Sequence, residues 1–118
     1  MNMMRIDLGS TPARTDGGFA ASVLLEHDQL KVRRIVLAAG ARIPPCQMQE
    51  DVVFVVVTGR ITFRAEADET LVAAPWAVFI PGGATTRSME AHEASLVLAV
   101  LCRRGAATPE RNERATNP

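Results

Sequence analysis

Val52-Val53-Phe54-Val55-Val56-Val57, followed by Thr58-Gly59, is the stretch that decides how this chain folds. Its β-branched and aromatic residues favour a strand, and the glycine is typical of a turn that ends one. A half-buried strand alternates apolar and polar residues, but this strand is apolar on both faces. We therefore expect one face to line the interior of the domain. The other face must pack on a second sheet, on the N-terminal arm or on another subunit.

Similar short runs lie on both sides of this strand, separated by turn signals at intervals of about ten residues. No long helical pattern competes with them. The spacing predicts an all-β domain that forms a barrel or a two-sheet sandwich. The expected strands are Phe19–Glu26, Leu30–Leu37, Val52–Val57, Arg60–Ala65, Thr70–Ala73, Ala77–Ile80 and Ser95–Cys102.

The length of 118 residues fits one domain, because a second core would have too little apolar surface to bury. Residues 1–18 mix Met, Pro, Gly and charge without a sustained period, and we expect them to form an arm and a turn. Residues 19–102 contain the β-domain. Residues 103–118 are polar and contain two prolines, so we expect a partly disordered tail.

The charge balance argues against two classes of partner. Thirteen basic residues match thirteen acidic ones, so no net field attracts nucleic acid or an anionic membrane. The apolar runs are far shorter than the roughly 20 residues of a membrane helix, and the N-terminus lacks the apolar region of a signal peptide. We therefore expect a cytoplasmic protein, in which Cys46 and Cys102 would be free thiols.

Two segments resemble the two sequence motifs of the cupin superfamily, in particular the small, single-domain RmlC-like cupins of the conserved-barrel (cupin 2) type. In the first segment, Gly40 and Gly59 stand at the separation of that motif's two glycines. In the second, which spans residues 75–90, Pro81-Gly82-Gly83 supplies the motif's Pro-x-Gly. The resemblance implies a small double-stranded β-helix, which is a cupin barrel or jelly-roll sandwich.

The metal-ligand positions of this family fall on other residue types here. Where the first motif has two histidines and a carboxylate, this chain has Cys46, Met48 and Val52, and where the second has a histidine it has Thr86. None of these four residues is a histidine or a carboxylate. The resemblance therefore implies a cupin with degenerate ligand motifs, in which we expect no bound metal, no cofactor and no catalytic residue.

The residue types themselves indicate what kind of pocket to expect. Residues two apart on a strand project from one face, so Cys46 and Met48 would share a face with Val52, Phe54 and Val56 if the strand were continuous. Hydrocarbon side chains on that face favour a small apolar ligand or simple packing.

Other candidate site residues have two or more interpretations. Cys46 and Met48 could pack in a core as a small hydrophobe and a gap-filler, or they could form a soft site for Cu(I). Cys46 could also be a reactive thiol. Thr86 would hydrogen-bond a ligand at the pocket mouth or pair with a neighbouring strand. Trp76, in a turn beside the pocket, would cap the core or act as a lid.

Five basic or ionisable residues complete the candidates. Three arginines could converge on an anionic substrate, although a solvated face is the favoured interpretation; they are Arg60, Arg64 and Arg87. His27 and His92 lie in predicted turns, so both are expected to be solvated.

These observations favour a metal-free cupin-like module that binds a small molecule or serves a structural role. A homodimer is expected, since Val53, Val55 and Val57 lie opposite the presumed pocket face and would otherwise be exposed in a row. One alternative is a metal-dependent cupin enzyme, dioxygenase- or isomerase-like, with non-standard ligands. The other is a Cu(I)-binding protein that uses Cys46 and Met48.

Overall fold

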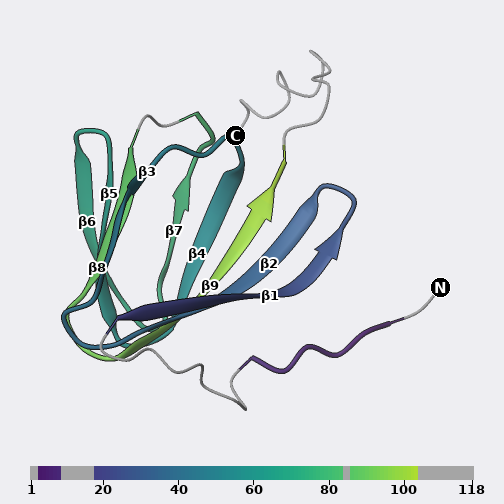
Figure 1. Ribbon diagram of the computed structural model, residues 1–118, viewed down its shortest axis with the longest axis horizontal. Coiled ribbons are helices and arrows are strands. Elements are labelled where there is room, and N and C mark those ends of the chain that lie inside the picture. Colours follow the sequence, from purple (N-terminus) through teal and green to yellow (C-terminus); the bar gives the residue numbers. More distant parts are fainter. Residues whose placement is uncertain (1–2, 9–17, 84–85, 104–118) are drawn as a thin grey trace.

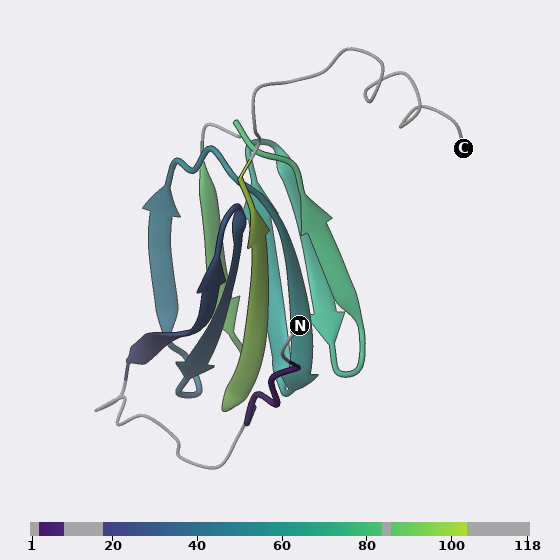
Figure 2. The same cartoon turned by 90° about the vertical axis from the view of Figure 1, so that its right-hand side faces the viewer.

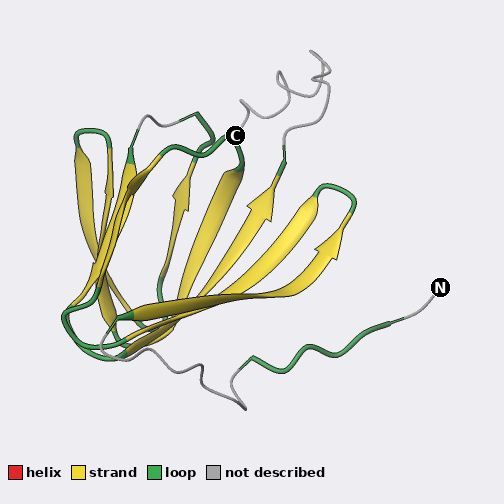
Figure 3. Cartoon of the chain, in the orientation of Figure 1, coloured by secondary structure: helices red, strands yellow, loops and turns green. Residues whose placement is uncertain are grey.

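The computed structural model describes residues 3–8, 18–83 and 86–103. These residues contain no helix, and therefore none that could cross a bilayer (Figure 3). They form nine β-strands, in the order β1 (Phe19–His27), β2 (Leu30–Leu37), β3 (Arg42–Cys46), β4 (Asp51–Thr58), β5 (Arg60–Ala65), β6 (Asp68–Ala73), β7 (Ala77–Ile80), β8 (Arg87–Ala91) and β9 (Ser95–Cys102).

The described strands pair as two antiparallel sheets. A five-stranded sheet has the order β1-β2-β9-β4-β7, and a four-stranded sheet has the order β3-β8-β5-β6. In Figure 1 the four-stranded sheet stands at the left and the five-stranded sheet extends from it to the right. The chain crosses repeatedly between the two sheets, for example from β2 to β3 and from β3 to β4. Strands far apart in the sequence, such as β2 and β9, therefore become neighbours. The prediction of an all-β, jelly-roll-like sandwich is confirmed.

The core lies between the two sheets, and β4 supplies part of it. Val52, Phe54 and Val56 are buried. This confirms the prediction that every second residue of this strand faces inward. The ring of Phe54 stacks on that of Phe63 from β5, with centroids 5.1 Å apart, so the contact joins one sheet to the other. On the outward face Val53 is 36% exposed. Val55 and Val57 on the same face are half-buried, so the row of exposed valines expected from the sequence is only partly present.

Seven predicted strands appear within two residues of their expected ends, but two strands were missed. The first, β3, contains Pro44 and Pro45, which lack N–H donors, and its pairing with β8 shifts register between Ile43 and Cys46. The second, β8, consists largely of polar residues and therefore lacks the expected hydrophobic run.

The predicted terminal segments are only partly within the described residues. The tail beyond residue 103 lies outside them, as do residues 1–2 and 9–17 of the arm. The described part of the arm, residues 3–8, forms no strand and runs along the outside of the domain (Figure 2).

Candidate functional site

A cavity of about 140 Å³ lies between the two sheets, and we call it the inter-sheet pocket. Its wall is mostly hydrocarbon. Seven strands and the loop before β4 contribute the lining residues, which are Phe19, Ala21, Arg33, Ile35, Ile43, Cys46, Met48, Phe54, Ile80, Arg87, Ser88, Met89, Ala99 and Leu101.

The mouth of the pocket lies between two edge strands. Strand β1 is an edge of the five-stranded sheet and β3 is an edge of the four-stranded sheet. Phe19 and Ala21 of β1 and Cys46 of β3 are all exposed, whereas Phe54 and Ala99 deeper in the pocket are buried. The pocket is therefore an apolar recess that opens to solvent on the β1–β3 side.

Arg87 is the charged residue buried in this wall. Only 4% of it is exposed, because it projects from the inward face of β8. Its Nη2 donates hydrogen bonds to the backbone carbonyls of Glu50 and Pro81, at 2.7 and 2.8 Å. Its Nε and Nη1 atoms have no hydrogen-bond partner among the described residues. The guanidinium is thus fixed in place but only partly satisfied.

The surroundings of Arg87 affect its protonation in opposite directions. Burial lowers the pKa of the Arg87 guanidinium, because an apolar environment disfavours a charge. The ionisable groups of Cys46, Glu50 and Asp51 oppose this effect in that order. A guanidinium nevertheless stays protonated at neutral pH. The pocket therefore contains a buried positive charge.

The turn at Pro81-Gly82-Gly83 packs directly on the loop that precedes β4. The Gly82 N–H donates to Asp51 Oδ1 at 2.6 Å, and the Gly83 N–H donates to the Met48 carbonyl at 3.0 Å. A Cβ atom on Gly82 would collide with the carbonyl of Gln49. The Pro-x-Gly turn thus keeps its structural role here, since it packs against the loop before β4. Arg87 bridges the same turn and the same loop.

The structure brings some of the predicted site residues to the pocket and leaves others elsewhere. Cys46, Met48 and Phe54 line it, and Cys46 is exposed at the mouth rather than buried in a core. Val52 and Val56 belong to the core and do not line the cavity.

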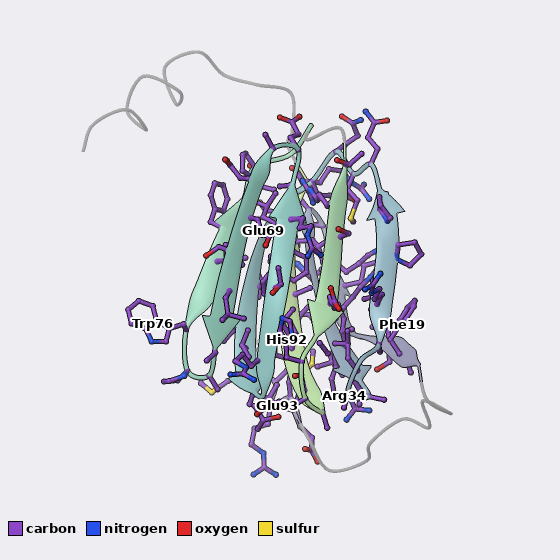
Figure 4. The ribbon with its side chains drawn as sticks, turned by 90° about the vertical axis from the view of Figure 1, so that its left-hand side faces the viewer. Phe19, Arg34, Glu69, Trp76, His92 and Glu93 are labelled. Carbon is purple, nitrogen blue, oxygen red and sulfur yellow. The ribbon has the colours of Figure 1, made fainter. Side chains whose placement is uncertain are left out.

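Two further predicted residues lie away from the pocket. Thr86 is exposed, and the structure does not bring it to the pocket wall. Trp76 is 71% exposed in the turn before β7, on the side of the molecule opposite Phe19, where it covers neither core nor pocket (Figure 4).

The interpretation of Arg87 as part of a solvated face is wrong. In the sequence Arg87-Ser88-Met89-Glu90-Ala91, Arg87 has the parity of Met89 and Ala91, and all three are buried. This alternation was a signal for an inward arginine. Arg64 lies on the opposite face of the same sheet, where Glu69 accepts a hydrogen bond from its Nε at 3.0 Å. Arg60 is exposed at the start of β5, so the three arginines do not converge on one site.

The two histidines are exposed, as predicted. His27 lies 3.5 Å from the carboxylate of Asp28. The ring of His92 shares a 2.6 Å hydrogen bond with the Thr62 hydroxyl on the outer face of the four-stranded sheet. Neither histidine lines the inter-sheet pocket.

No protein-family model matches the chain, and no curated protein matches it in sequence. Solved structures match it in fold. A cupin superfamily protein from Desulfitobacterium hafniense is 11% identical, with 86% of this chain and 100% of that one covered, at a TM-score of 0.71. An RmlC-like cupin from Shewanella frigidimarina is 14% identical, with 88% and 95% covered, at 0.72. Another, from Desulfovibrio desulfuricans, is 20% identical, with 85% and 97% covered, at 0.69. The chain therefore has the fold of the small cupins.

The residues at the pocket do not fit the metal centre that this fold implies. Within the described ranges, no three His, Cys, Asp or Glu side chains gather closely enough to hold an ion. Among the described lining residues, the sulfur donors are Cys46, Met48 and Met89. Iron, manganese, nickel and zinc sites use imidazoles, carboxylates or several thiolates. A soft donor set of this kind does not suit those ions.

Proposed function

We propose that this protein binds a small organic molecule in the inter-sheet pocket and needs no metal ion to do so. The observation that carries the proposal is a mostly apolar cavity of about 140 Å³, open between β1 and β3. A cavity of roughly 150 Å³ lined by apolar residues binds benzene in another protein, so this pocket has room for one ring or a short branched chain. Ligand sites of this kind are mostly apolar with a few placed polar groups.

Binding of a neutral aromatic probe tests this function. Calorimetry or ligand-observed NMR should show benzamide binding to the wild-type protein. Ala21→Leu adds bulk at the exposed rim of the pocket and should weaken that binding about tenfold, since it removes room for the ring. Ala77→Leu makes the same change on exposed β7, outside the pocket, and should leave binding unaltered. Equal binding by all three proteins, or by none, would contradict the proposal.

A second candidate function is binding of Cu(I). The observation in its favour is that Cys46 and Met48, a thiol and a thioether, both line the same pocket. Cu(I) accepts two or three soft ligands. Competition with a Cu(I) chelator should then give about one equivalent bound per chain, lost in both Cys46→Ser and Met48→Leu. Retention of copper by either variant would exclude this pair as the site.

We also propose that the protein is a cytoplasmic homodimer. Both cysteines are free thiols, which is the state that a reducing compartment maintains. The outward face of β4 presents Val53, Val55 and Val57 beside Leu98 and Val100 of β9, so a second copy would cover a continuous apolar surface.

A further inference from the structure

We infer that the ligand of the inter-sheet pocket carries a carboxylate on a compact apolar body, and that Arg87 pairs with this carboxylate. The inference rests on the proposed function and specifies its ligand class. The hydrocarbon side chains of the sequence favour an apolar ligand or simple packing, and the sequence-based interpretation places Arg87 on a solvated face.

The first argument is the incomplete satisfaction of Arg87. An unpaired buried charge is strongly unfavourable, so buried guanidinium groups in proteins are paired with an anion or fully hydrogen-bonded. The two carbonyls on Nη2 are neutral, and neither Glu50 nor Asp51, which favour the charged form, accepts a hydrogen bond from Nε or Nη1. Nε and Nη1 are closed to solvent, so bulk water does not serve them either. An anion bound in the pocket would supply the missing acceptor and a directly hydrogen-bonded counter-charge.

The second argument is the sign of the charge around the pocket. Arg33 joins Arg87 in the wall, and none of the described lining residues is Asp or Glu. Glu50 and Asp51 lie near Arg87 and favour its charged form, but neither lines the pocket, and the Asp51 Oδ1 accepts the Gly82 N–H at 2.6 Å. Apolar walls strengthen the field of the two guanidinium groups, because they exclude screening water. The pocket is therefore selective for an anion over a neutral molecule of the same shape.

The third argument is that the rest of the wall suits a hydrocarbon body. Ile35, Phe54, Ile80, Ala99 and Leu101 are buried apolar residues that line the cavity. An inorganic anion would leave this surface unfilled. A ring or branched chain of about six carbons would fill it, given the volume that benzene requires.

Thiol protection provides the test, because the chain contains two cysteines and both are exposed. Cys46 lines the pocket and Cys102 does not, so Cys102 is an internal control within the same protein. The rate of alkylation by iodoacetamide would be followed at each thiol by peptide mass spectrometry. The full-length chain would be titrated with benzoate and, separately, with benzamide, its uncharged analogue.

Benzoate should slow alkylation of Cys46 and leave Cys102 unchanged. Half-protection should need about tenfold less benzoate than benzamide, which is the size of effect expected for hydrogen bonds to a charged group. Arg87→Met should abolish this preference while retaining the hydrocarbon stem, and Arg33→Met, at the other lining arginine, should preserve it. Since the preference is a ratio within each protein, a general change in thiol reactivity does not produce it.

Three outcomes would overturn the inference. If benzamide protects Cys46 as well as benzoate does, the pocket binds small molecules but does not select an anion, and the proposed function survives alone. If Arg33→Met removes the preference and Arg87→Met does not, the assignment to Arg87 is wrong. If neither probe protects Cys46, both the inference and the proposed function fail. Should Arg87→Met not fold, the wild-type comparison and Arg87→Lys, which keeps the charge and should keep the preference, still decide the matter.

Discussion

Gly40 and Gly59, the two motif glycines, both have positive φ angles, of 82° and 95°, but only one is also packed. A Cβ atom on Gly40 would meet open space. A Cβ atom on Gly59 would meet the Ser95 hydroxyl, and would lie 2.6 Å from the Ser95 Cβ and 2.7 Å from the Ala94 carbonyl oxygen. Gly40 is therefore required for its backbone conformation alone, whereas Gly59 is required for its conformation and for the close packing of Ser95.

Alanine substitutions at these glycines should therefore have unequal costs. Gly40→Ala should reduce the free energy of unfolding by about 1 kcal/mol, which is the cost of a left-handed backbone for an L-residue. Gly59→Ala adds a collision with Ser95 and should cost about 3 kcal/mol or more. Urea denaturation of both variants measures the difference. Equal costs would show that packing against Ser95 is unimportant.

Arg87 shows where residue-level prediction from the sequence stops. The family's motif spacing indicated Thr86 as the site residue, but the inward residue in the structure is the next one along the chain. The alternation of Arg87 with Met89 and Ala91 correctly indicates that Arg87 faces inward. Buried arginines are rare, however, and for this reason the sequence alone favours a solvated side chain. Its two carbonyl partners come from Glu50 and Pro81, which only the tertiary structure brings together.

At the scale of the elements, hydrophobic strands were predictable and polar or proline-containing strands were not. β4 and β9 appear where their valine-rich runs indicated. β3 and β8 are defined by pairing with each other and, for β8, with β5, so their sequences carry little of the signal. On the outer face of this sheet, Arg42, Arg64 and Glu90 form ion pairs of 3.3 and 3.5 Å. Such exposed pairs contribute little to stability.

The contact between Phe54 and Phe63 should contribute far more than these ion pairs, because it joins the two sheets. Phe63 is 2% exposed, and Phe63→Ala should reduce the free energy of unfolding by about 3–5 kcal/mol. Leu71→Ala, on the adjacent strand β6 but 57% exposed, should cost less than about 1 kcal/mol. Thermal and urea unfolding would compare them. Similar values for the two variants would mean that the sheets do not depend on this stack.

At the scale of the whole molecule, the outward face of the five-stranded sheet predicts self-association. Light scattering or sedimentation should give the mass of a dimer for the wild-type protein. Val53→Lys places a charge in the proposed interface and should shift the protein to monomer. Leu71→Lys, on the outer face of the other sheet, should remain dimeric. A wild-type monomer, or dissociation by Leu71→Lys alone, would contradict this assignment.

The whole molecule combines the fold of the small cupins with a pocket for which we propose binding without a metal ion. Calorimetric titration of the wild-type protein with benzoate, before and after exhaustive treatment with a chelator, tests this most directly. We predict the same affinity in both states, because Arg87 and the apolar wall would provide the binding. Loss of binding after chelation, with recovery on adding iron, manganese, nickel or zinc, would contradict metal-free binding and favour a metal-dependent cupin enzyme.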